Sequence, residues 1–403
     1  MRNVKSAVCI SCGTEHEAGN DTYTCKKCGG ILEIQYDYAY IGSSLTRERL
    51  AARQDFSMWR YRELLPVEEG SALTPLRVGW SPLYRADRLG ERLGLKNLYI
   101  KDDGLNPSGS LKDRASAIAV VRAVHAGMDT VACSSTGNAA SSLAGNAAAM
   151  GLKSFIFVPE RAPKGKLTQL LIFGARVISV KGNYEDTFRL SAEAIEKWGW
   201  YNRNAAINPY LSEGKKTVSL EIAEQLGFKA PDYVAVSVGD GCTIAGVWKG
   251  FKDLYAIGLI KKLPRLISVQ AEGCCPINRA IETNRPIEHM EENTLADSIA
   301  VGVPRNGEKA LRAIRESSGL TVNVSDEEIL DAMRLLGATG GVFGEPAGVT
   351  GTAGLRKAAE QQLIPPDATV VSIVTGNGLK DVASAQQAAG EPIRIPPDMD
   401  ELT

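Results

Sequence analysis

The chain has 403 residues, of which 44% are hydrophobic and 23% are charged, and its formal net charge is −1. This length allows two or three domains with cores of their own. The balanced charge excludes the strongly basic surface that binding to nucleic acid or to an anionic membrane would need. No apolar run approaches the ~20 residues of a membrane helix. The N-terminal sequence MRNVKSAVCISC lacks the apolar region of a signal peptide, so we expect a cytoplasmic protein.

The first 36 residues stand apart because they contain two cysteine pairs. Cys9 and Cys12 form one CxxC pair, Cys25 and Cys28 form the other, and glycine follows each pair. Two such pairs predict four thiolates around one tetrahedral zinc ion, in a closed site that is structural rather than catalytic. A ribbon that has lost its metal is the alternative. A redox role is disfavoured because no βαβ pattern surrounds either pair.

The rest of the chain alternates between short β-branched runs and helical patterns of 10–15 residues. This alternation is typical of parallel sheets with helices on both faces, and it predicts an α/β fold. The predicted strands include residues 97–103, 129–135, 153–159, 233–239, 265–272, 320–324 and 368–376.

The segment NPSGSLKDR (106–114) places Lys112 at the start of a predicted helix. The positive end of the helix dipole favours the neutral form of a lysine amine at this position. A neutral amine is what Schiff-base chemistry requires. An ordinary solvated lysine is the alternative from this segment alone.

Three further segments follow predicted strands and begin predicted helices or loops. CSSTGNAASS (133–142) presents hydroxyl, amide and N–H groups at a helix start, which suits a carboxylate or phosphate, or serves only as a helix cap. VGDGCTIAG (238–246) has the glycines of a phosphate-binding turn but matches neither a Walker A loop nor GxGxxG. VTGNGLKD (374–381) places Thr375 at the carboxyl end of the last strand, where α/β sheets bind ligands.

Together, and in this order, the four segments resemble threonine synthase and its relatives among the fold-type II pyridoxal-phosphate enzymes. PSGSLKDR resembles the family pattern PTGSFKDR, and the family's STGN motif is present unchanged. Further similarity runs through residues 59–67, 213–222 and 345–355, so that the resemblance covers nearly the whole chain. A zinc ribbon before the catalytic body is also found in many members of this family.

The resemblance implies a role for each motif. Lys112 would hold pyridoxal 5'-phosphate as a Schiff base, Asn138 would lie beside the ring hydroxyl, and Thr375 would bond the pyridine nitrogen. The amino-acid substrate would bind through Ser135, Thr136, Gly137, Asn138 and Lys216. The cofactor phosphate would be held by Gly239, Asp240, Gly241, Cys242 and Thr243. Relatives are usually dimers, so we expect a homodimer.

The fold implied by the resemblance is α/β, with two open, twisted, mostly parallel domains and an N-terminal zinc ribbon. We expect the ribbon at residues 1–36. The large cofactor-binding domain would combine residues 37–112 with 229–395, and the small domain would span 113–228.

Two departures from the family pattern bear on the substrate. The glycine loop usually reads GNAGN, and here Asp240 adds a negative charge beside the expected phosphate site. In place of NPxRxEGxKT the chain reads NPYLSEGKKT, so that Leu211 occupies the position of an arginine that helps bind the substrate phosphate. Lys215 or Lys216 would have to compensate, or the substrate would lack that phosphate.

The expected activity is therefore that of a threonine synthase, converting O-phosphohomoserine and water into threonine and phosphate. The alternative is a sister β-elimination or β-replacement enzyme, such as a threonine/serine dehydratase or a cysteate synthase. A third reading, a zinc-ribbon binding protein on a retired catalytic body, is disfavoured because Lys112, Asn138 and Thr375 are all present.

Overall fold

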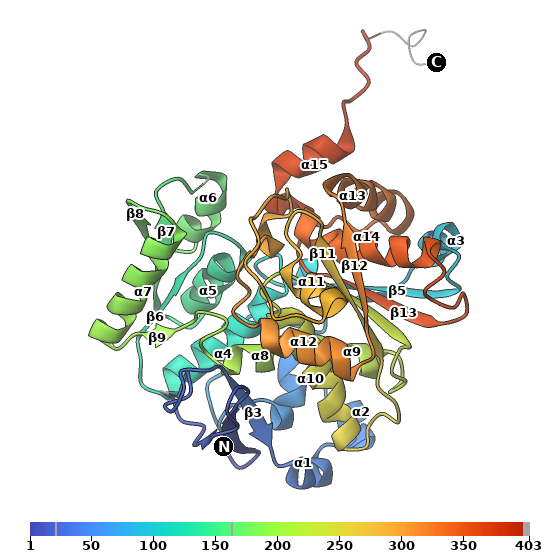
Figure 1. The fold of residues 1–403 in the computed structure, drawn as a ribbon. Coiled ribbons are helices and arrows are strands. Elements are labelled where there is room, and N and C mark those ends of the chain that lie inside the picture. Colours follow the sequence, from blue (N-terminus) through green and yellow to red (C-terminus); the bar gives the residue numbers. More distant parts are fainter. Residues whose placement is uncertain (21, 163, 398–403) are drawn as a thin grey trace.

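The computed structural model describes residues 1–20, 22–162 and 164–397, and within them the chain forms two lobes and a small N-terminal sheet (Figure 1). One lobe is built on a four-stranded sheet and the other on a six-stranded sheet, each covered by helices. The N-terminal segment lies against the base of the molecule in the view of Figure 1.

The four-stranded sheet is entirely parallel and has the strand order β8-β7-β6-β9. Its central strand β6 is buried along its whole length, as expected for a strand covered on both faces. The strands are β6 (Thr130–Ser134), β7 (Lys153–Pro159), β8 (Arg176–Val180) and β9 (Tyr201–Asn202). The helices of this lobe are α4 (Lys112–His125), α5 (Asn138–Ala149), α6 (Lys164–Ile172) and α7 (Tyr184–Trp198).

The six-stranded sheet has the order β12-β11-β10-β13-β5-β4, and β4 is its one antiparallel strand. Its strands are β4 (Leu83–Arg85), β5 (Asn97–Asp102), β10 (Tyr233–Ser237), β11 (Arg265–Ala271), β12 (Leu320–Val324) and β13 (Thr369–Val374). The helices around it are α3 (Asp87–Leu93), α10 (Cys242–Ala256), α11 (Pro276–Thr283), α12 (Gly307–Glu316), α13 (Asp326–Gly340), α14 (Pro346–Glu360) and α15 (Val382–Ala389).

Two consecutive helices lie between the lobes. Helix α8 (Tyr210–Lys215) packs against α4 on one side and α10 on the other, and α9 (Thr217–Gln225) packs against α10. Since every strand of the small sheet lies between residues 130 and 202, the strands of the large sheet come from both sides of it in the sequence. This interleaving brings β-strand ends from distant parts of the chain to the region between the lobes.

The N-terminal segment forms an antiparallel sheet of order β2-β1-β3, made of β1 (Val4–Cys9), β2 (Glu15–His16) and β3 (Leu32–Tyr36). It is followed by α1 (Tyr38–Ser44), α2 (Arg47–Ala52) and the 3₁₀ helix η1 (Met58–Leu64). Ala7 and Ile34 belong to the same buried cluster as Trp248 and Phe251 of α10. The three-stranded N-terminal sheet therefore shares the core of the larger lobe.

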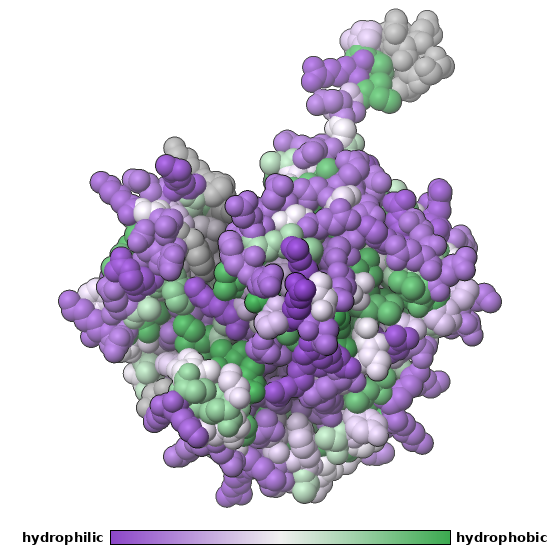
Figure 2. Space-filling view, viewed as in Figure 1, coloured by the Kyte–Doolittle hydropathy of each residue, from purple (hydrophilic) through white to green (hydrophobic). Residues whose placement is uncertain are grey.

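The strands and helices predicted from the sequence are present with small differences at their ends. The short strands β4 and β9, which carry no clear period-2 pattern, were not predicted. Over the described part of the chain, no helix combines the length and apolar character needed to cross a bilayer. The face drawn in Figure 2 is mostly hydrophilic with small hydrophobic patches, as is usual for a globular protein.

Candidate active site

Lys112 is the first residue of α4, in the region between the lobes. The chain just before it is held against the end of β13, because the N–H of Leu111 donates to the carbonyl of Thr375 at 2.8 Å. Burial, followed by the positive charge of the nearby Lys215, lowers the pKa of Lys112 to about 8. Burial and the charge of Lys215 thus act in the same direction as the helix dipole. The site favours a neutral amine close to physiological pH.

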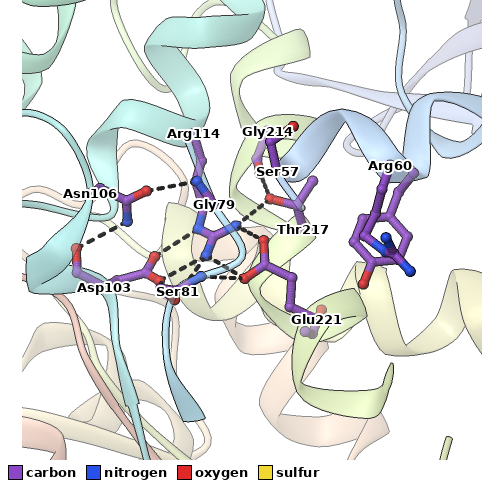
Figure 3. Close-up of polar contacts among 12 residues, drawn as sticks. Ser57, Arg60, Gly79, Ser81, Asp103, Asn106, Arg114, Gly214, Thr217 and Glu221 are labelled. Atoms are coloured by element: carbon purple, nitrogen blue, oxygen red, sulfur yellow. Dashed lines mark hydrogen bonds and ion pairs between the residues drawn. The ribbon is translucent and has the colours of Figure 1, made fainter. Parts of the chain in front are cut away.

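A buried ion network fixes the start of α4 two residues after Lys112 (Figure 3). The guanidinium of Arg114 donates to both carboxylate oxygens of Asp103 at 2.7 and 2.8 Å, and it bonds the Glu221 carboxylate on its other side. Lys101 adds a bond to Glu221 at 2.7 Å. All four side chains are fully buried. The network ties α4 to β5 and α9, and so positions Lys112.

The glycine loop connects β10 to α10 directly beside Lys112. A side chain at Gly239 would bring its Cβ within 2.7 Å of the Cα of Ile299, and Gly241 has a φ of +88°. Both positions therefore need glycine. The loop ends at the N-terminus of α10, whose free N–H groups suit a phosphate. Lys112, Thr375 and loop residues 239–243 line one cavity.

Asp240 lies beside this N-terminus, and its carboxylate already has two hydrogen-bond donors within the protein. Its carboxylate accepts a hydrogen bond from the backbone N–H of Arg305 at 2.7 Å and one from the thiol of Cys242 at 3.0 Å. Burial and the neighbouring Asp240 raise the pKa of Cys242, which keeps this thiol protonated. The departure from the family's glycine loop thus places an acidic side chain beside the helix N-terminus, with both of its carboxylate oxygens bonded inside the protein.

The STGN turn reaches the same cavity through Asn138. Thr136, Gly137 and Asn138 line a larger cavity of about 510 Å³ that continues from the cofactor side, and Ser135 faces a third cavity. Asn138 donates from Nδ2 to Glu345 Oε1 at 2.6 Å. The structure therefore brings the turn to the region of Lys112, and the hydroxyl of Ser135 accepts a hydrogen bond from the N–H of Gly137 at 3.2 Å.

Lys216 was predicted to meet the substrate, and the structure places it elsewhere. Its ammonium group is fully buried between Glu213 at 2.6 Å and Asp253 at 2.5 Å, over the ring of Tyr36. These two ion pairs count against a contact between Lys216 and the substrate, because the ammonium group is already neutralised inside the protein. Its neighbour Lys215 is 1% exposed and lines the cavity with Lys112. No acid within the described ranges forms an ion pair with Lys215.

Two groups in the cavity were not among the predicted site residues. Glu345, at the start of α14, lines both the Lys112 cavity and the larger one, and burial raises its pKa to about 7. Lys380 donates to Ser141 at 3.1 Å and to Gln169 at 2.6 Å at the wall of the larger cavity. Both lie within segments that carry the family resemblance, but nothing local in the sequence shows where they point.

The four N-terminal cysteines converge on one point. Their Sγ atoms all lie within 4.8 Å of one another, and the Cys9–Cys28 and Cys12–Cys25 separations are 3.5 and 3.7 Å. Four sulfurs at the Zn–S distance of ~2.3 Å in a tetrahedron would be ~3.8 Å apart. His16 bonds Cys25 through Nε2 at 3.2 Å and would lie outside such a set of four. The donor set fits zinc.

Comparison with known proteins agrees with this geometry. The family model described as "Pyridoxal-phosphate dependent enzyme" matches residues 75–376. The threonine synthase of Methanocaldococcus jannaschii is 42% identical over 98% of this chain and 97% of its own length. That of Methanosarcina acetivorans is 41% identical over 98% of this chain and 96% of its own, and that of Synechocystis is 40% identical over 84% and 87%.

Solved structures with the same fold have lower sequence identity. The processed form of threonine deaminase isoform 2 from Solanum lycopersicum aligns with a TM-score of 0.64 and 23% identity, over 77% of this chain and 87% of that one. Diaminopropionate ammonia lyase from Escherichia coli aligns with a TM-score of 0.67 and 20% identity, over 85% and 92%. These likenesses establish the fold.

The chain belongs to the family of pyridoxal-phosphate-dependent enzymes. Within that family it is a lyase of the threonine synthase type, since its relatives with that name match it over nearly their whole length. The resemblance read from the four motifs and the expected fold-type II α/β architecture are both confirmed.

Proposed function

We propose that this chain converts O-phosphohomoserine and water into threonine and inorganic phosphate, with Lys112 as the covalent anchor of pyridoxal 5'-phosphate. The observation that carries this proposal is the meeting of Lys112, the glycine loop and Thr375 around one cavity. The threonine synthases of Methanocaldococcus jannaschii and Methanosarcina acetivorans, which this chain matches over 97% and 96% of their lengths, support it. Bound pyridoxal phosphate supplies an electron sink for negative charge that develops on the substrate.

Each residue of the cavity has a distinct proposed task. The N–H groups of loop 239–243 and the ammonium of Lys215 would hold the cofactor phosphate, and the hydroxyl of Thr375 would bond the pyridine nitrogen. Asn138 would bond the ring hydroxyl, and the turn from Ser135 to Asn138 would receive the substrate carboxylate. The assignment of Lys215 to the cofactor phosphate is supported by charge. Its buried ammonium group has no acidic partner within the described residues, and the phosphate would supply the opposite charge.

Proton transfer falls to two groups whose pKa values lie near neutrality. The Nζ amine of Lys112, with its pKa lowered to about 8, is suited to take the proton from the substrate Cα. The carboxyl of Glu345, with its pKa raised to about 7, is suited to carry a second proton nearby.

One observation favours a second candidate function. Leu211, at the position where an arginine would bind the substrate phosphate, is fully buried in the apolar core of the small lobe and offers no hydrogen bond. This would suit a sister enzyme whose substrate carries no phosphate, such as a dehydratase acting on serine or threonine. A β-replacement enzyme such as a cysteate synthase is the other form of this alternative.

A parallel assay of purified holoenzyme separates these functions. With O-phosphohomoserine, we expect phosphate and threonine in equal amounts. L-threonine, L-serine and O-phosphoserine are run beside it, the last with and without sulfite. Keto acid from the first two, or phosphate from O-phosphoserine alone, would move the assignment to the sister enzyme.

We propose zinc as the ion held by Cys9, Cys12, Cys25 and Cys28. The sulfur separations and the all-thiolate donor set support this assignment. Metal analysis of the purified protein tests it, with one zinc per chain expected. Cys12→Ser should lower that content, whereas Cys133→Ser, which changes a buried thiol outside the cluster, should leave it unchanged.

The remaining assignments are also proposals. A homodimer and domains at 1–36, 37–112 with 229–395, and 113–228 follow from the resemblance, and location in the cytoplasm follows from the sequence composition. The eight free cysteines support a reducing compartment. Light scattering of the purified protein tests the dimer, and limited proteolysis tests the domain boundaries.

A further inference from the structure

A second group of polar side chains lines a cavity of about 470 Å³ next to the cofactor side of the site. The two cavities share Ala205 and Asp240 among their lining residues, so they adjoin. Arg203, Asn204 and Ser134 contribute to the wall of this second cavity. Ser134 belongs to the segment 133–142 described above, whereas Arg203 and Asn204 lie outside all four motifs.

The backbone places the three side chains together. Ser134 ends β6, and Arg203 and Asn204 follow the neighbouring parallel strand β9. The N–H of Arg203 donates to Ala132 O at 2.9 Å, and the N–H of Ser134 donates to Asn204 Oδ1 at 3.0 Å. All three therefore stand at the carboxyl ends of adjacent strands, where ligands bind in sheets of this kind.

Each of the three side chains carries a buried polar atom without a hydrogen-bond partner. These atoms are Nη2 of Arg203, Nδ2 of Asn204 and Oγ of Ser134. Arg203 is 1% exposed and its one side-chain bond goes from Nε to Ser116 Oγ at 3.1 Å. No carboxylate in the described part of the chain forms an ion pair with it. A buried unpaired guanidinium costs several kcal/mol, so an anionic partner is expected.

All three unpartnered groups can donate a hydrogen bond, and one of them is cationic. Such a set matches an acceptor with several oxygens, above all a phosphate group. The acidic side chains Asp240 and Glu292 also line the cavity, but each accepts a backbone hydrogen bond, from Arg305 at 2.7 Å and from Gly302 at 2.9 Å. The acidic side chain of Glu185 also lines this cavity.

Arg203 and Leu211 lie against the same helix. Leu211 packs in the apolar cluster with Ala115 and Ala119 of α4, while Arg203 bonds Ser116 of that helix. The positive charge of Arg203 also acts on Lys112, where it helps to lower the pKa. The chain thus lacks a guanidinium at position 211 but has one nearby, within electrostatic range of the reacting lysine.

We propose that Arg203, Asn204 and Ser134 bind the phosphate group of the amino-acid substrate. This inference rests on the proposed function, and it names the residues that take the place of the missing arginine. The substrate would lie between Lys112 and this cavity, with its phosphate against the ends of β6 and β9.

Ser134→Ala gives the cleanest test, because it removes a hydroxyl that has no partner in the protein. Its matched control is Ser191→Ala, which removes another buried, unpartnered hydroxyl of the same lobe on α7. The experiment measures KM and kcat for O-phosphohomoserine and, by calorimetry, the binding of inorganic phosphate to the holoenzyme. Arg203→Gln and Asn204→Asp are measured in the same way, the latter keeping the acceptor oxygen for Ser134.

We expect Ser134→Ala to raise KM about 3- to 10-fold and Arg203→Gln to raise it about 10- to 100-fold, with kcat little changed. Phosphate binding should weaken in parallel, and the affinity for pyridoxal phosphate should stay the same. Ser191→Ala should match the wild type. If Arg203→Gln does not fold, Ser134→Ala and Asn204→Asp carry the test.

Three results would overturn the inference. They are absence of phosphate binding to the wild-type holoenzyme, unchanged KM and phosphate binding in Ser134→Ala and Asn204→Asp, or a loss of cofactor affinity in place of substrate affinity. A wild-type enzyme that binds phosphate through these residues but does not convert O-phosphohomoserine would refute the proposed function and leave the phosphate site standing.

Discussion

Asn138 and Glu345 are separated by 207 residues in the sequence, and Asn138 Nδ2 donates to Glu345 Oε1 at 2.6 Å. Asn138 begins α5 of the small lobe, and Glu345 precedes α14 of the large one. Their bond therefore joins the lobes at the wall of the active site. Because burial raises the pKa of Glu345 to about 7, the carboxyl in this contact changes charge near physiological pH.

Glu345→Gln should change how stability depends on pH. The pKa of Glu345 rises from 4.5 to about 7 on folding, so its contribution to stability is full below pH 4.5 and is lost as the pH rises through 7. Between pH 4.5 and 8, the stability of Glu345→Gln relative to wild type should increase by about 3 kcal/mol. Urea unfolding of the cofactor-free protein at several pH values measures this. A difference independent of pH would contradict it.

The attachment of pyridoxal phosphate should follow the ionisation of Lys112. The rate should rise with pH, with an inflection near 8, because the neutral amine is the reactive form. Lys215→Met removes a positive charge that lowers this pKa, so the inflection should move to higher pH. Absorbance of the bound cofactor after mixing reports the rate. Lys112→Ala should give no borohydride-reducible cofactor and should lose at least about 10³-fold in activity.

Lys229→Met is the control for the shift, since Lys229 is an exposed lysine that follows α9. An inflection that stays at the same pH in Lys215→Met would show that the charge of Lys215 does not reach Lys112.

Arg114→Met should destabilise the fold by about 3–5 kcal/mol, because it leaves the buried carboxylates of Asp103 and Glu221 without their main partner. Arg114→Lys keeps the charge but not the two-sided geometry, and it should fall between wild type and Arg114→Met. The pKa of Glu221 is lowered to about 2, so the stability from this network should be lost as the pH falls from 4.5 towards 2. Unfolding curves from pH 7 down to pH 3 measure both effects.

Gly239→Ala should weaken cofactor binding by about tenfold or more, because the added Cβ would lie 2.7 Å from backbone Cα of Ile299 and force the loop to move. Gly337→Ala is its control, since no atom lies within 4 Å of that Cβ and the position is inside α13. It should leave the cofactor affinity unchanged and stabilise the helix by up to about 1 kcal/mol. Equal effects of the two substitutions on cofactor affinity would contradict the role given to the loop.

The parts of the site that could be predicted from the sequence are those held in continuous motifs. Lys112, the STGN turn and the glycine loop each lie between a strand and a helix, so local pattern and family resemblance were enough to find them. The choice between Lys215 and Lys216 could not be made in this way. Adjacent residues on a helix point about 100° apart, and only the packing of α8 decides which one faces the cavity.

Arg203 and Asn204 could not be found from the sequence for a different reason. They follow β9, a two-residue strand with no pattern of its own. We singled them out because each has a buried side-chain nitrogen without a hydrogen-bond partner. Such an atom can be recognised only when the positions of the surrounding side chains are known. The sequence also predicts the N-terminal ribbon as a separate unit. In the structure its apolar side chains belong to the same buried cluster as those of the large lobe.

The way in which the N-terminal sheet is attached limits how the protein can be altered. Tyr36 donates to Glu213 at 2.8 Å, and Lys309 donates to the carbonyl of Leu32 at 2.5 Å, so residues of both α8 and α12 depend on this sheet. Cutting the chain after residue 36 would uncover part of the apolar surface around Trp248 and Phe251, which a short purification tag could not cover. A truncated version would therefore be prone to aggregate. If it lost activity, the cause would be damage to the whole enzyme, and the loss would not demonstrate a catalytic role for the ribbon.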